Sequence, residues 1–225
     1  MGEDSKALVA IVDYGLGNLF SVKHACEHVG LDATVTHLKK EILSADAVIL
    51  PGVGAFSHAM DALKHLDLVD TLKEVGVSSK PLVGICLGLQ LVMTESYEFG
   101  HHEGLGLVPG RVVRLDRPIN FYETLKVPQV CWNKLLYPKK DVGDFWRGTL
   151  LEGLSHGVFM HFVHSFYVQP DDPSMILATT QYGNVEFCSA LTCRNIFACQ
   201  CHPERSGVHG LQVYRNLAMK LNLSL

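Results

Sequence analysis

The stretch PLVGICLGLQLVM at residues 81–93 decides the fold class, because it indicates a buried strand that runs through Cys86 into a helix. Gly84 and Gly88 flank the cysteine in the G-x-nucleophile-x-G pattern of a strand-to-helix elbow. Small residues let strand and helix approach closely, and the strained turn lifts the nucleophile above the sheet. The N–H of Leu87 then lies at a helix N-terminus, where it can donate to a developing oxyanion. The alternative is a buried core cysteine with incidental glycines.

The first half of the chain alternates apolar strands with amphipathic helices. The expected strands lie at residues 7–12, 33–36, 47–50 and 81–85. Such alternation is typical of a parallel sheet with helices on both faces. After about residue 104 strand-like runs dominate, and a helical stripe of apolar residues follows near the end. The sequence therefore predicts an α/β fold with a mixed, mostly parallel central sheet and antiparallel additions in the second half, within a single domain over residues 1–225.

The composition is that of an ordinary globular protein, with 48% hydrophobic and 19% charged residues. Lys plus Arg number 19 and Asp plus Glu 23, so the net charge is −4 and offers no basic footprint for nucleic acid. The start, MGEDSKALVAIVDYG, is not typical of a signal peptide, and no apolar run is long enough to predict a membrane span. An odd count of seven cysteines favours reduced thiols. We therefore expect a cytoplasmic protein that binds neither nucleic acid nor membrane.

A thiolate nucleophile needs a general base, and the base needs a group that orients it. The best candidates are His202 and Glu204, which follow the apolar run NIFAC at 195–199. Pro203 biases His202 toward an extended backbone, in which residues i and i+2 point to the same side. The carboxylate would then fix the imidazole tautomer. The alternative is a turn with a surface histidine and glutamate.

A cysteine elbow followed by His-Pro-Glu resembles the class I, or triad-type, glutamine amidotransferases, whose fold is flavodoxin-like. Within that class the sequence closely resembles the glutaminase subunit of imidazole glycerol phosphate synthase. The matching segments are IVDYGLGNLFSV at 11–22, ILPGVGAF at 49–56, GICLGLQLV at 84–92, GLGLVPGRV at 104–112, HSFYV at 164–168 and HPERSG at 202–207. They keep their order over nearly the whole chain, and the first two discriminate best among members of the class.

The resemblance implies a glutaminase that needs neither cofactor nor metal. Cys86 would attack the side-chain amide of glutamine, and His202 would deliver a proton to the leaving ammonia. Water would cleave the glutamyl thioester to give glutamate. The ammonia would pass through an internal channel to a (β/α)8-barrel cyclase in a heterodimer. The cyclase would make imidazole glycerol phosphate and an aminoimidazole carboxamide ribotide in histidine biosynthesis.

The resemblance also assigns residues around the nucleophile. The expected oxyanion donors are Val53, Gly54 and Leu87. The expected substrate-binding residues are Gly52, Gln90, Glu98, His164, Ser165 and Phe166. Glu98 would face the α-ammonium of glutamine, and the glycines beside Val53 would make a peptide flip easy. From the residues alone, a plain turn fits the glycines equally well, and an exposed helix face fits Gln90 and Glu98 better.

The chain departs from the family pattern where the partner is expected to dock. The common Pro-His-Met-Gly-Trp-Asn is replaced by Pro-Gln-Val-Cys-Trp-Asn at 128–133, and a common tyrosine is replaced by His161. Trp132, Asn133 and His161 are the expected interface residues. These departures leave Cys86, His202 and Glu204, the expected triad, intact. They bear on how the partner docks and on the coupling between the two active sites.

Other interpretations compete with this one. Cys199, Cys201 and His202 could be metal ligands, but a closed zinc site needs four ligands, usually with wider spacing, so the thiols fit small apolar core residues better. The chain could also be a stand-alone cysteine hydrolase on a related elbow fold, or a catalytically silent metal-binding or regulatory module. Within the amidotransferase class, another ammonia acceptor is a further possibility.

Overall fold

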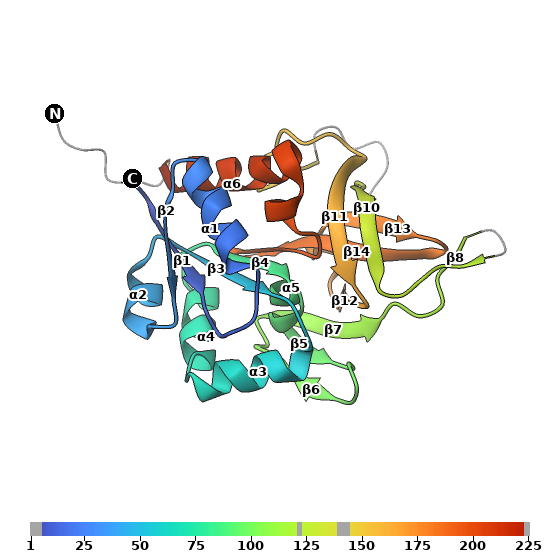
Figure 1. Cartoon of the computed structure of the whole chain (residues 1–225), viewed down its shortest axis with the longest axis horizontal. Coiled ribbons are helices and arrows are strands. Elements are labelled where there is room, and N and C mark those ends of the chain that lie inside the picture. The colour runs from blue at the N-terminus through green and yellow to red at the C-terminus, as the bar shows by residue number, and fades with distance from the viewer. Residues whose placement is uncertain (1–5, 121–122, 139–144, 223–225) are drawn as a thin grey trace.

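The computed structural model describes residues 6–120, 123–138 and 145–222, and its frame is a twisted parallel sheet (Figure 1). The strands of this part lie in the order β2-β1-β3-β4-β15, and each is parallel to its neighbours. Their bounds are β1 Leu8–Val12, β2 Asp32–Thr36, β3 Ala47–Gly52, β4 Leu82–Cys86 and β15 Ile196–Cys199. This order is the flavodoxin-like one, in which ligands bind beyond the carboxyl ends of the strands.

The second half of the chain extends the same sheet with mainly antiparallel strands. β14 pairs with β15, β12 with β14, β7 with β12 and β13 with β14, all antiparallel, while β5 runs parallel to β7 and antiparallel to β6. The bounds are β5 Met93–Ser96, β6 His102–Glu103, β7 Val108–Arg114, β12 Phe166–Pro170, β13 Ile176–Tyr182 and β14 Val185–Cys193. The predicted α/β class with a mixed sheet is thus confirmed. The single-domain extent of 1–225 stays a prediction.

Helices cover both faces of the sheet and divide the apolar interior into two cores. α1 (Leu19–His28) and α6 (Gly207–Asn222) pack on one face, shown uppermost in Figure 1. The other face carries α2 (Lys39–Ser44), α3 (Phe56–His65), α4 (Val69–Val77) and α5 (Leu87–Leu91). The helix expected to continue to residue 93 ends at Leu91, because Met93 already begins β5. No helix in the described ranges is long and apolar enough to cross a membrane.

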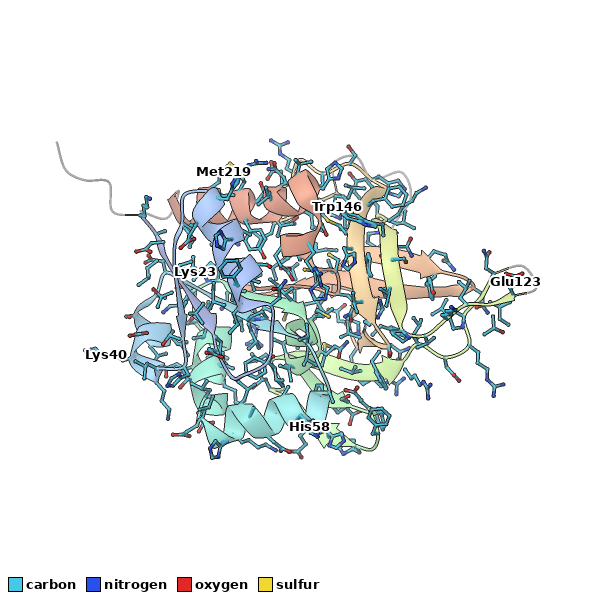
Figure 2. The ribbon with its side chains drawn as sticks, viewed as in Figure 1. Lys23, Lys40, His58, Glu123, Trp146 and Met219 are labelled. Carbon is cyan, nitrogen blue, oxygen red and sulfur yellow. The ribbon has the colours of Figure 1, made fainter. Side chains whose placement is uncertain are left out.

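A separate two-stranded sheet stands beside this frame. β10 (Gln129–Leu135) pairs antiparallel with β11 (Val158–His164) over its full length. A short hairpin of β8 (Ile119–Asn120) and β9 (Glu123–Thr124) precedes it. Trp146 packs behind the β10–β11 hairpin and donates its Nε1–H to the Leu177 carbonyl at 2.7 Å (Figure 2). One face of this hairpin therefore belongs to a core, while the other faces solvent.

Candidate active site

Cys86 occupies a strained turn between β4 and α5. Its φ of 55° and ψ of −104° lie in a region that a non-glycine residue adopts only under constraint, at a cost of about 1–3 kcal/mol. Its two flanking glycines allow the surrounding chain to close in. A Cβ on Gly84 would lie 2.9 Å from the Gly88 carbonyl oxygen, and a Cβ on Gly88 would overlap the Leu50 carbonyl. The glycine frame is thus required by crowding around the elbow.

Three strand ends bring the remaining groups to Cys86. Gly52, the last residue of β3, lies beside Cys86 in the parallel register. On the other side of β4, Cys199 of β15 pairs with Ile85, so the segment leaving β15 carries His202 toward the same edge. This convergence follows from parallel pairing, because neighbouring strands end at one edge of the sheet.

His202 and Glu204 form a buried pair, with Nδ1 of the imidazole 2.8 Å from Oε1 of the carboxylate. The pairing does not arise from an extended chain, because Pro203–Arg205 form a 3₁₀ turn. Burial by itself lowers the pKa of His202, but interactions with the Cys86 thiol and the Glu204 carboxylate outweigh it and raise this pKa from 6.5 to about 10. The imidazole therefore favours its protonated form beside the thiol.

Gln200 is a contact of the nucleophile that the sequence analysis did not single out. Its Nε2 lies 3.6 Å from Sγ of Cys86, and its Oε1 accepts a hydrogen bond of 3.2 Å from Nε2 of Gln90. Gln90 also donates to the Phe166 carbonyl at 3.0 Å. The thiol is 3.6 Å from the Val163 carbonyl as well. A polar residue two places before His202, at the end of an apolar strand, was the available signal for Gln200.

A cavity of about 260 Å³ opens above Cys86, close to the size that suits a small ligand. Most expected site residues line it. They are Val53, Gly54, Cys86, Leu87, Gln90, Glu98, His164, Ser165, Phe166 and His202. Asn18, Pro128, Val163 and Arg205 also line it and were not predicted as site residues. Glu204 lies behind His202, while Trp132, Asn133 and His161 stand outside the lining. Gly52, expected to bind substrate, is also absent from the lining and is buried against Tyr14 and Leu87.

The structure does not support the exposed helix face considered for Gln90 and Glu98. Gln90 is 5% exposed, and Glu98 is 8% exposed on the segment that follows β5. Oε2 of Glu98 accepts the backbone N–H of Phe56 at 2.6 Å, at the start of α3. The carboxylate therefore complements the positive end of that helix while it lines the cavity. Tertiary packing, not local sequence, buries both side chains.

His164 is held as a neutral imidazole under the cavity wall. Its Nδ1 lies 2.9 Å from the Phe166 carbonyl, which accepts the proton and so fixes the tautomer. Burial, together with the charge of His202, lowers the pKa of His164 to about 4, although the hydrogen bond to Phe166 opposes this shift. His164 therefore shapes the segment 164–166 and does not add positive charge beside the substrate space.

A hydrogen-bonded clamp joins the β10–β11 hairpin to His202. The backbone N–H of His202 donates to the His161 carbonyl at 2.9 Å. Ser206 Oγ accepts from the His161 N–H at 3.0 Å and donates to the His202 carbonyl at 2.7 Å. On the solvent side, the His161 ring stacks edge-on against Trp132, with centroids 5.8 Å apart. Trp132 and His161, two of the expected interface residues, are thus connected to His202 both directly and through the buried Ser206, whereas Asn133 bonds to Gln181 instead.

The cysteines near His202 are core residues. Cys199 and Cys201 are buried in the core beneath α1 and α6, and Cys199 Sγ lies 3.6 Å from the Cys201 carbonyl. His202 turns Nδ1 to Glu204. Among the residues that the structure describes, no group of three or more His, Cys, Asp or Glu side chains gathers as a metal site would require.

Solved structures show the same fold at low sequence identity. PurLQS from Thermotoga maritima aligns with a TM-score of 0.71 and 18% identity, covering 96% of this chain and 100% of that chain. A putative GMP synthase protein from Thermoplasma acidophilum aligns with a TM-score of 0.68 and 17% identity, covering 99% and 97%. At such identities the similarity shows the fold alone.

A family model described as glutamine amidotransferase class-I matches residues 10–221. It includes the elbow, the His202–Glu204 pair and the cavity, so fold, site and sequence define one class of protein.

Curated relatives narrow the class further. The imidazole glycerol phosphate synthase subunit HisH of Syntrophotalea carbinolica is 44% identical over 211 residues, which is 93% of this chain and 98% of that protein. The protein of the same name from Sulfurimonas denitrificans is 41% identical, over 96% of this chain and 100% of that protein. The chain therefore belongs to the class-I glutamine amidotransferases and, within them, to the family of imidazole glycerol phosphate synthase subunits HisH.

Proposed function

We propose that this chain hydrolyses glutamine through a thioester on Cys86 and delivers ammonia to a cyclase subunit that forms imidazole glycerol phosphate in histidine biosynthesis. The observation that carries the proposal is the strained Cys86 beside the buried His202–Glu204 pair, at the floor of a cavity that also holds the Glu98 carboxylate. A nucleophile, a base with its orienting group and a counter-charge for an amino acid are all present there.

The chemistry follows from the positions of these groups. The proton of Cys86 passes to His202, Sγ attacks Cδ of the glutamine side chain, and the negative charge moves to the amide oxygen. The N–H of Leu87, at the start of α5, and a peptide N–H from Val53 or Gly54 stabilise that oxyanion. The His202 imidazolium gives its proton to the leaving nitrogen, which departs as ammonia. Water then adds to the thioester, and glutamate and the free thiol result.

The cavity wall supplies the recognition of glutamine. Oε2 of Glu98 is bonded to the Phe56 N–H, which leaves Oε1 to accept from the α-ammonium group. Gln90 commits its Nε2 to Phe166 and Gln200, which leaves its carbonyl oxygen as an acceptor. The backbone at 164–166 completes the wall. The buried carboxylate makes the site selective for a free amino acid over an internal peptide residue.

The partner binds the exposed face of the β10–β11 hairpin. Val130, Trp132 and Phe159 are 59%, 52% and 48% exposed there, an unusual grouping of large apolar side chains on one small sheet. Asn133 donates to the Gln181 carbonyl at 2.9 Å and ties this sheet to β13. We assign this face to a (β/α)8-barrel cyclase in a heterodimer. All seven cysteines lie in the described part of the chain and are free thiols, which supports a cytoplasmic location.

Glutamate release by the purified chain, alone and with the cyclase and its ligand, tests the proposal. We expect weak turnover alone, strong stimulation by the partner, and a glutamyl adduct on Cys86 that mass spectrometry detects after acid quenching. Cys193→Ala is the matched control, because Cys193 is a free thiol outside the cavity. Turnover of peptides or esters without the partner would instead support a stand-alone hydrolase.

A further inference from the structure

Two segments that lie far apart in the sequence meet behind residues 51–54, which carry the proposed oxyanion donors and are called the oxyanion strand below. The hydroxyl of Tyr14, in the segment 11–22, donates to the Pro51 carbonyl, in the segment 49–56, at 2.7 Å. Tyr14 is 3% exposed, and the residues of the Pro51–Gly52 peptide are buried as well. A buried hydrogen bond of this kind fixes the plane of the peptide to which the carbonyl belongs.

The fixed peptide is the one that precedes the proposed oxyanion donors. The Pro51 carbonyl and the Gly52 N–H share it, and Gly52 lies beside Cys86 in the sheet register. Beyond Gly52 the chain leaves the strand, Val53 is 43% exposed, and Gly54 adopts a φ of +113°. The Tyr14–Pro51 hydrogen bond therefore fixes the end of β3, while the Val53–Gly54 segment that follows has room to rotate.

Gly52 has no side chain because the Tyr14 hydroxyl occupies that space. A Cβ at this position would overlap Tyr14 Oη and would lie 2.9 Å from Leu87 Cβ. The phenol thus sits between the oxyanion strand and the first residue of α5. A tyrosine that only filled the core would not need to place its polar atom at this crowded junction.

The phenol keeps its proton under all working conditions. Burial raises the pKa of Tyr14 strongly, and the neighbouring Cys86 raises it further, because a phenolate there would be poorly solvated and close to a thiolate. Tyr14 therefore acts as a constant donor to Pro51.

We infer that Tyr14 is a positioning residue for the oxyanion hole. It holds the Pro51–Gly52 peptide so that rotation is confined to the Gly52–Val53 and Val53–Gly54 peptides, whose N–H groups are the proposed oxyanion donors. This inference rests on the proposed glutaminase function. It assigns to Tyr14 a part in oxyanion stabilisation and none in proton transfer or in glutamine binding.

Tyr14→Phe tests the inference by removing one oxygen atom. With the cyclase and its ligand present, we expect kcat for glutamine hydrolysis to fall about tenfold, less than the roughly 10²–10³ that follows the loss of a whole oxyanion donor. KM should stay within about twofold, because the Glu98 and Gln90 contacts are untouched. Alkylation of Cys86 by iodoacetamide forms no oxyanion, so its rate should also stay within about twofold. Tyr182→Phe, which removes a hydroxyl bonded to the Lys126 carbonyl, is the matched control.

Hydrogen exchange gives a second measurement that does not depend on catalysis. Amides of residues 47–54 should exchange faster in Tyr14→Phe than in the unmodified chain, while the amides of β1 and β4 keep their protection. Unchanged kcat, unchanged exchange in 47–54, or an equal fall in the alkylation rate would each overturn the inference. If the unmodified chain releases no glutamate with its partner, the proposed function fails, and the exchange result still decides whether Tyr14 holds this strand.

Discussion

The elbow around Cys86 and the β10–β11 hairpin differ in how completely their residues are packed. Beneath the elbow the backbone packs without free space, and a single added Cβ on Gly88 would overlap the Leu50 carbonyl. On the hairpin, Trp132 and Phe159 leave about half of their surface in solvent. One region is fixed by contacts within the chain, and the other leaves its apolar contacts unmade.

This difference matches the tasks that we propose for the two regions. Catalysis needs reacting groups held in place before the substrate arrives, so the surrounding packing must be complete. Association needs apolar surface that becomes buried only in the complex. The clamp of His161, Ser206 and His202 connects the two regions directly.

The largest loss of activity should follow removal of the proposed nucleophile at the elbow. Cys86→Ala should lower glutamine hydrolysis by a factor on the order of 10³ or more, because no other thiol of the described residues lines the cavity. The fold should persist, since alanine keeps the Cβ and the backbone strain of the turn and removes only the sulfur atom. A glutaminase assay and a thermal melt check both points. Activity above about 1% of the original would contradict the assignment of Cys86.

Filling the elbow should damage the fold itself. Gly88→Ala should destabilise the chain by about 3 kcal/mol and abolish glutamine hydrolysis, because its Cβ has no space beside Leu50. Gly148→Ala is the control, since a Cβ added at Gly148 would meet no atom within 4 Å. The only cost there is that of a side chain at a φ of +77°, about 1 kcal/mol. Urea denaturation compares the two variants. Equal midpoints would show that crowding at the elbow is not what matters.

The His202–Glu204 pair beside the Cys86 thiol should make the free energy of unfolding depend on pH. The pKa of His202 is raised from 6.5 to about 10 in the folded state, so its contribution is fully present below pH 6.5 and is lost as pH rises through 10. Glu204→Gln removes one cause of the raised pKa and should shrink this loss. It should also slow glutamine hydrolysis by about 10²-fold, because the imidazole loses its orienting group. Urea midpoints between pH 6 and 10, together with kcat, test both effects, and identical stability profiles would refute the first.

Substitutions on the exposed face of the β10–β11 hairpin should change the affinity for the cyclase and leave the stability of the fold unchanged. Trp132→Ala should weaken association with the cyclase by more than about 1 kcal/mol, roughly fivefold in Kd, while the melting temperature changes little. Val77→Ala is the control, because Val77 is 64% exposed at the end of α4 on another part of the surface. Titration with the cyclase distinguishes them. Equal affinity for both variants would place the interface elsewhere.

The smallest effects should come from the substituted hairpin positions. Contrary to the expected placement at the partner-facing side, Gln129 is buried and Cys131 half-buried on the core-facing side of β10, opposite to Trp132. Gln129→His combined with Cys131→Gly should therefore act on the partner only indirectly and change its stimulation by less than about tenfold, and ammonia-dependent synthase turnover should persist. His161→Tyr should act similarly, because its ring contacts Trp132 while its backbone contacts His202 and Ser206. Stimulation curves measured against cyclase concentration test this expectation. Complete loss of stimulation would mean that these side chains transmit, and do not merely tune, the coupling.

The sequence by itself determined the α/β class and the position of the elbow, and it predicted Cys86 as the nucleophile. Continuous apolar runs marked β1, β3 and β4 of the parallel frame, because these strands are buried on both faces of the sheet. Gly84 and Gly88 marked the elbow, because only glycine tolerates such close backbone approach. The order of the motifs along the chain added the family.

Only the tertiary structure decided how distant segments meet. It placed Gln200 against Cys86, turned Glu98 to the start of α3, and joined Tyr14 to Pro51. It also paired His202 with Glu204 through a 3₁₀ turn in place of an extended chain. The pairing of His202 with Glu204 was predictable from their spacing, but no local pattern encodes the contacts of Gln200, Glu98 and Tyr14. Each of these joins segments that are distant in the sequence, and long-range packing alone brings such segments together.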